Sequence, residues 1–284
     1  MNVLITGCNG QLGRELRLLQ KENDDIRWTN ADIEELDITD PTAIEAYVAK
    51  HRIDSIVNCA AYTAVDKAEE DAERCRILNA LAPEYLARAM AKRGGQLIQI
   101  STDYVFDGTA HQPYTETDTP RPTGVYGQTK LSGERAAIAA CPDTIVIRTA
   151  WLYSPFGNNF VKTMLRLGRE RENLGVVFDQ IGTPTYAHDL AIAIVAALRK
   201  PLPAGIYHFT NEGATSWYDF AVAIHRIARI HTCTVHPLHT AEYPTPAQRP
   251  FYSLLDKTKI KRTLGIEIRH WEDALNHCID RLEA

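Results

Sequence analysis

The stretch TGCNGQLG, residues 6–13, places three glycines at intervals of three directly after the short apolar run Asn2–Thr6. A brief apolar run that ends at a glycine predicts a buried parallel strand. The leucines at helical spacing after it predict an amphipathic helix over Gln11–Gln20. Glycine is required where a side chain would block a phosphate or the contact between helix and strand, and the start of a helix presents free N–H groups to an anion. The stretch therefore predicts a strand–turn–helix unit that binds a dinucleotide.

The same alternation of strand and helix continues through the first half of the chain. Runs of apolar residues bounded by turn residues predict strands, and segments rich in alanine with periodic apolar positions predict helices. Alternating strands and helices are typical of an α/β protein with a Rossmann-like, doubly wound parallel sheet. The predicted strands are Ile26–Ala31, Ser55–Cys59, Gln96–Ser101 and Thr144–Thr149, and the predicted helices are Ala43–Lys50, Ala72–Arg93 and Gly127–Ala140.

The pattern changes after Trp151, where proline and glycine enter motifs such as GTPT at 182–185 and the alternation weakens. We expect residues 1–153 to form a Rossmann domain that binds NAD(P). Residues 186–210 are expected to return to it, with Leu190–Leu198 and Ile206–Phe209 beside the sheet. Most of residues 154–284 are then expected to form a smaller C-terminal lobe that binds the substrate.

Composition excludes several classes of protein. A net charge of −5 without a cluster of Lys and Arg argues against nucleic-acid binding. No apolar run reaches the roughly 18 residues of a membrane span, and the start MNVLITG does not resemble a signal peptide. The six cysteines are scattered without C-x-x-C spacing, which favours reduced thiols over a disulfide framework. We expect a soluble cytoplasmic protein.

Asp32 lies near the end of the second predicted strand, where an acidic side chain can bind the ribose hydroxyls of a dinucleotide. An acid there repels a 2′-phosphate and favours NADH, whereas the nearby Arg14 can counter it and admit NADPH. A solvated turn acid is an equally good interpretation of Asp32.

Two later motifs, STDYVFDG at 101–108 and YGQTK at 126–130, supply groups that protonate a carbonyl receiving hydride. Tyr126 is the candidate acid, although a free phenol titrates at about 10. Lys130 lies one helical turn later on the same face, and its positive charge is expected to lower the pKa of Tyr126. Thr102, at the end of a predicted strand, can hydrogen-bond the substrate carbonyl.

Further strings along the chain resemble the dTDP-4-dehydrorhamnose reductase family of extended short-chain dehydrogenases/reductases. They are NCAAYTAVDKAE at 58–69, STDYVFDG at 101–108, RTAWLY at 148–153, GNNF at 157–160, DQIGTPT at 179–185 and RPFYS at 249–253. The resemblance implies NAD(P)H-dependent reduction of the 4-keto group of dTDP-4-dehydro-6-deoxy-L-mannose, giving dTDP-L-rhamnose. It implies the catalytic residues Thr102, Tyr126 and Lys130 and the cofactor-binding residues Gly7, Asn9, Gly10, Gln11, Leu12, Gly13, Asp32, Asp37, Ile38, Ala60, Ala61, Tyr62, Tyr126 and Lys130. It also implies substrate contacts from Thr102, Asp103, Tyr104, Trp151, Asn158 and Arg249.

Other activities stay open at this point. A nucleotide-sugar dehydratase needs an Asp-Glu pair after the threonine, but Asp103 is followed by Tyr104. Another 4-ketoreductase, an epimerase with the same three catalytic groups, or a non-catalytic regulatory subunit of the methionine adenosyltransferase type are the alternatives.

Some members of the family bind magnesium between subunits through glutamates. Glu15 matches one such position, but His188 stands where another is expected, and the histidines lack ligand spacing. We therefore expect no required metal, and either a monomer or a homodimer.

Overall fold

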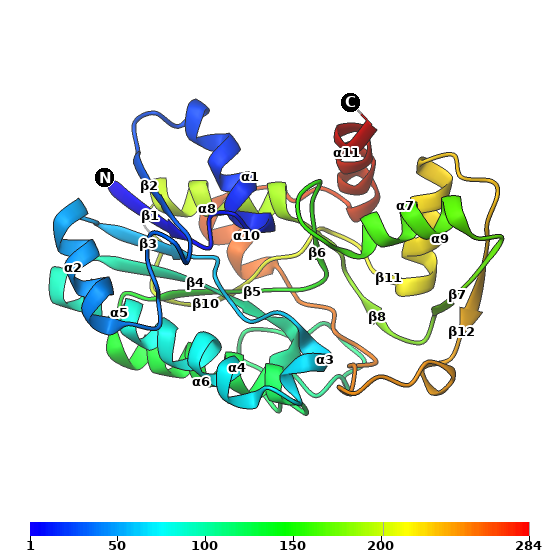
Figure 1. The fold of residues 1–284 in the computed structure, drawn as a ribbon, viewed down its shortest axis with the longest axis horizontal. Coiled ribbons are helices and arrows are strands. Elements are labelled where there is room, and N and C mark those ends of the chain that lie inside the picture. Colours follow the sequence, from blue (N-terminus) through cyan, green and yellow to red (C-terminus); the bar gives the residue numbers. More distant parts are fainter. Residues whose placement is uncertain (201, 284) are drawn as a thin grey trace.

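The computed structural model describes residues 1–200 and 202–283. At its centre lies a six-stranded sheet in the order β10-β5-β4-β3-β1-β2 (Figure 1). Every neighbouring pair in this sheet is parallel, which confirms the predicted doubly wound fold. Its strands are β1 (Asn2–Thr6), β2 (Arg27–Ala31), β3 (Ser55–Asn58), β4 (Gln96–Thr102), β5 (Ile145–Thr149) and β10 (Gly205–His208).

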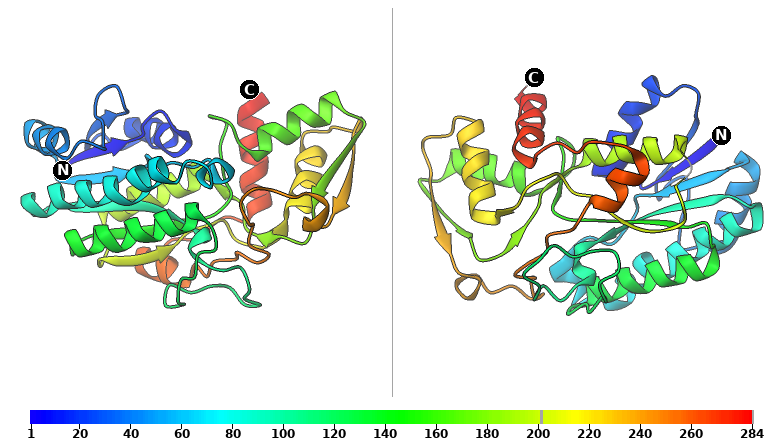
Figure 2. Two further views of the ribbon diagram at one scale, coloured as in Figure 1. Left: turned by 60° about the horizontal axis from the view of Figure 1, so that its bottom comes forward. Right: turned by 180° about the vertical axis from the view of Figure 1, so that it is seen from behind.

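Helices cover both faces of the sheet because its central strands are apolar on both sides (Figure 2). One face packs against α1 (Gln11–Leu19), α8 (Ala187–Arg199) and α10 (Thr258–Leu264), which share one buried apolar cluster with β1. The opposite face packs against α2 (Pro41–His51), α5 (Ala82–Arg93) and α6 (Val125–Ala140). The sheet is therefore the middle layer of three.

The segment predicted as one helix over Ala72–Arg93 is interrupted. It consists of α4 (Ala72–Arg76), a π-helical turn at Ile77–Leu81, and α5, and it follows the short helix α3 (Val65–Ala68). The π turn places Asn79 against the backbone of Tyr62, with hydrogen bonds at 2.9 and 3.0 Å. Helical periodicity in the sequence does not reveal such an inserted residue, and π turns are frequent at functional sites.

A second lobe lies beside the sheet (Figure 1). Its apolar core brings together Tyr153, Phe220 and Trp271 from separate elements. Its helices are α7 (Phe160–Glu170), α9 (Trp217–Ile227) and α11 (Trp271–Glu283). Its strands form three pairs, β7 (Asn173–Val177) with β12 (Thr234–Leu238), β8 (Ile181–Gly182) with β11 (Thr215–Ser216), and β6 (Leu152–Tyr153) with β9 (Thr185–Tyr186).

The two lobes are not continuous in sequence, because the chain passes from one to the other more than once. After β5 it enters the second lobe, and it comes back through α8 and β10, whose register aligns Gly205 with Ile145 of β5. In an open parallel sheet, ligands bind beyond the carboxyl ends of the strands where the strand order reverses. Here that point lies between β1 and β3. No helix among residues 1–200 and 202–283 is long and apolar enough to cross a bilayer.

Candidate active site

A cleft of about 1000 Å³ opens between the carboxyl ends of the central strands and the second lobe. Most of the residues predicted from the sequence line it: Gly7, Gly10, Gln11, Leu12, Asp32, Asp37, Ile38, Ala60, Ala61, Thr102, Asp103, Tyr104, Tyr126, Lys130, Trp151 and Asn158. Four predicted residues do not line it, and these are Asn9, Gly13, Tyr62 and Arg249.

The glycine loop forms one end of the cleft. Gly7 has φ +62°, and a Cβ on it would lie 2.7 Å from the backbone nitrogen of Ala60. A Cβ on Gly13 would lie 2.4 Å from the carbonyl oxygen of Gly7, so Gly13 acts behind the loop by letting α1 approach β1. The helix cap residue Gly10 has no side chain to occupy the first N–H groups of α1. These amides are free to bind an anion such as a pyrophosphate.

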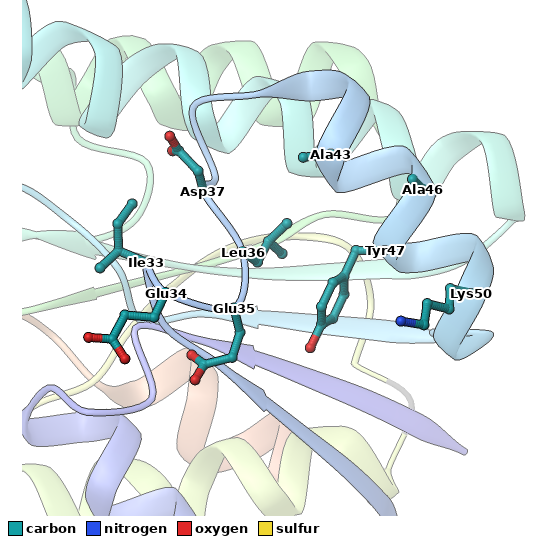
Figure 3. A pocket seen from close by; sticks show the side chains of 9 residues that line it. All are labelled: Ile33, Glu34, Glu35, Leu36, Asp37, Ala43, Ala46, Tyr47 and Lys50. Carbon is teal, nitrogen blue, oxygen red and sulfur yellow. The ribbon is translucent and has the colours of Figure 1, made fainter.

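Asp32 lies directly after β2 at the same end. Its carboxylate accepts hydrogen bonds from the backbone of Asn9 at 3.0 Å and of Ile33 at 2.9 Å. Asn9 therefore supports the acid from behind and does not face the cleft. A shallower hollow of about 420 Å³ adjoins this end, and Figure 3 shows Tyr47 and Lys50 of α2 on one side of it.

The three groups proposed for chemistry lie together on the wall formed by β4 and α6. Tyr126 and Lys130 stand one turn apart on α6, and the buried Lys130 ammonium donates to the carbonyl oxygen of Ile100 in β4 at 2.6 Å. Thr102 ends β4. A Cβ on Gly127 would lie 2.2 Å from the carbonyl oxygen of Tyr104, so this glycine lets α6 press against the turn that carries Thr102.

Burial dominates the electrostatics of this wall. It raises the pKa of Tyr126, while interaction with the Thr102 hydroxyl lowers it in part. Burial also lowers the pKa of Lys130 to about 8, and the nearby Glu134 opposes that shift. The predicted lowering of the Tyr126 pKa by Lys130 is wrong: burial raises that pKa, and the group that opposes the rise is the Thr102 hydroxyl and not Lys130. Tyr126 is thus a protonated phenol at neutral pH, which suits a proton donor.

A buried ion pair supports this wall from behind. Glu134, one turn after Lys130 on α6, accepts from Arg148 of β5 at 2.9 and 2.7 Å. The same carboxylate accepts from the Ser101 hydroxyl at 2.5 Å. Because both ionic side chains are fully buried, the pair locks α6, β4 and β5 to one another.

Two indoles face the cleft from the second lobe. Trp151 stacks on Trp217 with ring centroids 3.5 Å apart, and both line the cleft. Asn158 also lines it, and the neighbouring Asn159 caps α7 while its side-chain nitrogen donates to Gln11 at 2.9 Å. The lobe is therefore hydrogen-bonded directly to the glycine loop.

Arg249 lies outside the lining of the cleft. Its guanidinium donates to Asp66 of α3 at 2.7 Å, and its Nη1 is buried without a hydrogen-bond partner. Its charge still acts on Tyr104, whose pKa burial raises and Arg249 lowers. Tyr62 does not face the cleft, and its backbone N–H and carbonyl are held in place by hydrogen bonds to the Asn79 side chain.

Comparison with known proteins agrees with this arrangement. The family model described as the RmlD substrate binding domain matches residues 1–284. A dTDP-4-dehydrorhamnose reductase from Aggregatibacter actinomycetemcomitans is 42% identical over 285 residues, with 97% of each chain covered. The chain belongs to the dTDP-4-dehydrorhamnose reductase family.

Solved structures of other dTDP-4-dehydrorhamnose reductases share the whole fold. One from Clostridium acetobutylicum has a TM-score of 0.96 and 44% identity, with 100% of each chain covered. One from Bacillus anthracis, in complex with NADP, has a TM-score of 0.93 and 38% identity, with 99% of each chain covered. The resemblance seen in the sequence motifs is confirmed.

Among the cleft residues of this dTDP-4-dehydrorhamnose reductase family member that were not predicted from the sequence, three polar or aromatic side chains stand out. Arg74 of α4 and Trp217 of α9 line the cleft, but neither lies in a motif that marks it. Asn159 also lines it and was overlooked beside Asn158, although an asparagine before an amphipathic helix is a recognisable N-cap.

Glu15 and His188, the two positions considered for a metal from the sequence, lie in contact with each other and with Arg281. The fully buried Glu15 accepts from Arg281 at 3.1 and 3.0 Å, and His188 lies 3.1 Å from the same carboxylate. Within residues 1–200 and 202–283, no group of three or more His, Cys, Asp or Glu side chains is arranged to hold a metal ion.

Proposed function

We propose that this protein reduces the 4-keto group of dTDP-4-dehydro-6-deoxy-L-mannose to give dTDP-L-rhamnose, using NADPH or NADH. The observation that carries the proposal is that Thr102, Tyr126 and Lys130 line the same cleft as the glycine loop. A dinucleotide held by that loop would lie at the carboxyl ends of the strands, where these groups also stand. The relatives named above act on the same sugar nucleotide.

The residues at the glycine loop fit a dinucleotide. The space that a Cβ on Gly7 would fill and the free amides at the start of α1 accommodate a pyrophosphate. Asp32 stands where the adenosine ribose is expected, with Asp37, Ile38 and Ala60–Ala61 further along the same wall. The reduced nicotinamide, when bound, supplies the hydride.

Tyr126 donates its phenolic proton to the sugar oxygen as negative charge develops there. Its buried phenol is protonated before the reaction, and a positioned acid of this kind contributes about 10²–10⁴-fold. The Lys130 ammonium, held by the Ile100 carbonyl, places positive charge on the same face of α6. It would bind the nicotinamide ribose of the cofactor. Thr102 holds its hydroxyl oxygen beside the phenol.

The sugar nucleotide occupies the side of the cleft nearer the second lobe. Trp151, backed by Trp217, provides a flat apolar surface for the sugar. Asn158, Asp103 and Tyr104 provide polar groups on the lining. Arg249 remains a proposed substrate residue because its Nη1 has no partner and its charge reaches Tyr104.

We further place the enzyme in the cytoplasm, as a monomer or a homodimer. Its six cysteines are all free thiols, which suits a reducing compartment. Nucleotide sugars and nicotinamide cofactors are small anions, and a chain with net charge −5 binds them at local sites and not through a broad basic surface.

The test is to mix the protein with freshly prepared dTDP-4-dehydro-L-rhamnose and follow the loss of reduced-nicotinamide absorbance with each cofactor. The product is then identified as dTDP-L-rhamnose by its sugar configuration. Absence of turnover with both cofactors, in protein shown to be folded, contradicts the proposal. If the protein instead copurifies with a methionine adenosyltransferase and turns over no ketone, it is the regulatory subunit.

A further inference from the structure

Asp103 is a carboxyl group buried on the wall of the cleft beside the reacting groups. It is 2% exposed and follows Thr102 at the end of β4. One of its oxygens accepts a hydrogen bond from the Thr102 hydroxyl at 3.0 Å. No hydrogen bond of normal geometry reaches its other oxygen, which is buried, although the Ser253 hydroxyl lies close enough to hydrogen-bond the carboxyl and lower its pKa. A carboxyl group buried on the cleft wall beside the reacting groups calls for a functional explanation.

The Thr102 hydroxyl stands between Asp103 and Tyr126. Its oxygen accepts from the backbone N–H of Tyr104 at 3.2 Å, and it also interacts with the Tyr126 phenol. A hydroxyl has a single proton to donate. When that proton points to the Asp103 carboxylate, the phenol oxygen of Tyr126 receives no hydrogen bond from Thr102.

The competition for this proton depends on the charge of Asp103. An ionised carboxylate accepts only, whereas a protonated carboxyl can donate its own proton to the Thr102 oxygen. In the second case the Thr102 proton is free to turn to Tyr126, where it stabilises the tyrosinate that forms during reduction. Burial raises the pKa of Asp103 to about 6, against the hydroxyls of Ser253 and Thr102, so both forms are accessible near neutral pH.

We propose that Asp103 is a positioning residue that sets the proton-donor strength of Tyr126 through the Thr102 hydroxyl. The inference rests on the proposed reductase function. The titratable side chains that face Asp103 are Tyr104 and Tyr126. The charges of the Arg249–Asp66 pair act on Tyr104 and are not among the groups that shift the pKa of Asp103.

The proton balance is as follows. Tyr126 passes its phenolic proton to the sugar oxygen, and the tyrosinate left behind accepts the Thr102 hydroxyl hydrogen bond. That proton then moves to the tyrosinate oxygen as the Asp103 proton moves to the Thr102 oxygen. Tyr126 and Thr102 are restored, Asp103 becomes a carboxylate, and it recovers a proton from solvent once the product leaves.

The experiment measures kcat between pH 5 and 8 with saturating substrate and cofactor. The wild type is expected to be roughly 10-fold faster on the acid side of a step near pH 6, since a hydrogen bond to a charged group is lost above it. Asp103→Asn carries no proton that titrates in this range, so the step disappears. Thr102→Val also removes the step, whereas Thr102→Ser keeps the hydroxyl and keeps the step.

Glu116 supplies the matched control. It is another carboxyl whose pKa burial raises, but it bonds the backbone of His208 at 3.1 Å and does not line the cleft. Glu116→Gln is expected to keep the wild-type step. Calorimetric binding of dTDP by each variant shows that its site is intact, and the Thr102 pair carries the test if Asp103→Asn does not fold.

A step near pH 6 that persists in Asp103→Asn or in Thr102→Val overturns the inference, as does a wild-type profile that is flat through this range. If Glu116→Gln also removes the step, the step does not arise from Asp103 specifically, and the inference is overturned as well. Each of these results leaves the reductase function standing. Absence of turnover in the wild type itself contradicts the proposed function instead.

Discussion

Arg281 of α11 and Glu15 of α1 lie 266 residues apart, and the guanidinium of one donates to both carboxylate oxygens of the other at 3.1 and 3.0 Å. Glu15 is fully buried, while Arg281 is one-quarter exposed. The pair fastens the last helix of the chain to the helix whose first turn holds the glycine loop.

Replacing Arg281 by Gln is expected to lower the free energy of unfolding by about 3 kcal/mol, because a buried carboxylate loses its counter-charge. Urea unfolding of the variant measures this loss. Arg169→Gln is the matched control, since its pair with Glu283 of α11 is exposed on both sides and 3.7 Å long, and it is expected to change stability by less than about 1 kcal/mol. Equal losses of stability in the two variants contradict the conclusion that Arg281 neutralises a buried charge.

Activity is expected to survive an excess of EDTA. The Glu15 carboxylate already accepts from Arg281 and lies within hydrogen-bonding distance of His188, so these groups occupy the oxygens that a cation needs. Turnover is compared before and after chelation and dialysis. Loss of activity that magnesium restores shows that a metal is required after all.

Gly13→Ala is expected to weaken cofactor binding and stability together. Its Cβ would meet the Gly7 carbonyl oxygen at 2.4 Å, so α1 has to move away from the turn that receives the pyrophosphate. Gly94→Ala is the control for cofactor binding. Gly94 has a φ of +65° and nothing within 4 Å of its Cβ position, so an alanine there strains its own backbone but leaves α1 and the glycine loop in place. The measurements are the dissociation constant of NADPH and the thermal midpoint. A normal dissociation constant in Gly13→Ala argues against this account of the loop.

Tyr126→Phe keeps the aromatic ring and its edge contact with Tyr104, at 5.4 Å between centroids, and removes the proposed proton donor. Turnover is expected to fall by about 10²–10⁴-fold while the protein still folds and binds the cofactor. Single-turnover kinetics beside cofactor titration separates the two effects. Near-normal turnover would exclude the phenol as the acid.

Lys130 is expected to set an upper pH limit for cofactor binding. Burial lowers its pKa from 10.5 to about 8, so the ammonium is present below about pH 8 and is lost above it. The affinity for NADPH is therefore expected to decline above pH 8 in the wild type. Lys130→Met is expected to bind weakly with no such decline, and a pH dependence that persists in this variant belongs to another group. The stability of the protein is expected to change in the opposite direction. Between pH 8 and 10.5 the Lys130 amine is protonated in the unfolded chain but increasingly neutral in the folded one, so the contribution of Lys130 to the free energy of unfolding rises with pH.

Local spacing in the sequence determined the dinucleotide loop and the reacting groups. The three glycines after an apolar run define a strand–turn–helix that needs no distant contact to be recognised. Tyr126 and Lys130 share one helix face because they stand four residues apart. Both features follow from backbone geometry within a few residues, so they can be predicted from the sequence alone.

Only the tertiary structure decided how these groups are tuned and what surrounds them. The pKa of Tyr126 depends on how completely the cleft wall excludes water, and burial is a property of packing that spacing does not encode. Trp217 stacks on Trp151, and Arg281 pairs with Glu15, across long sequence separations. No periodicity in the sequence predicts either contact. The link from Asp103 through Thr102 to Tyr126 joins adjacent and distant residues alike, because α6 packs closely against the turn after β4, where Gly127 has no side chain.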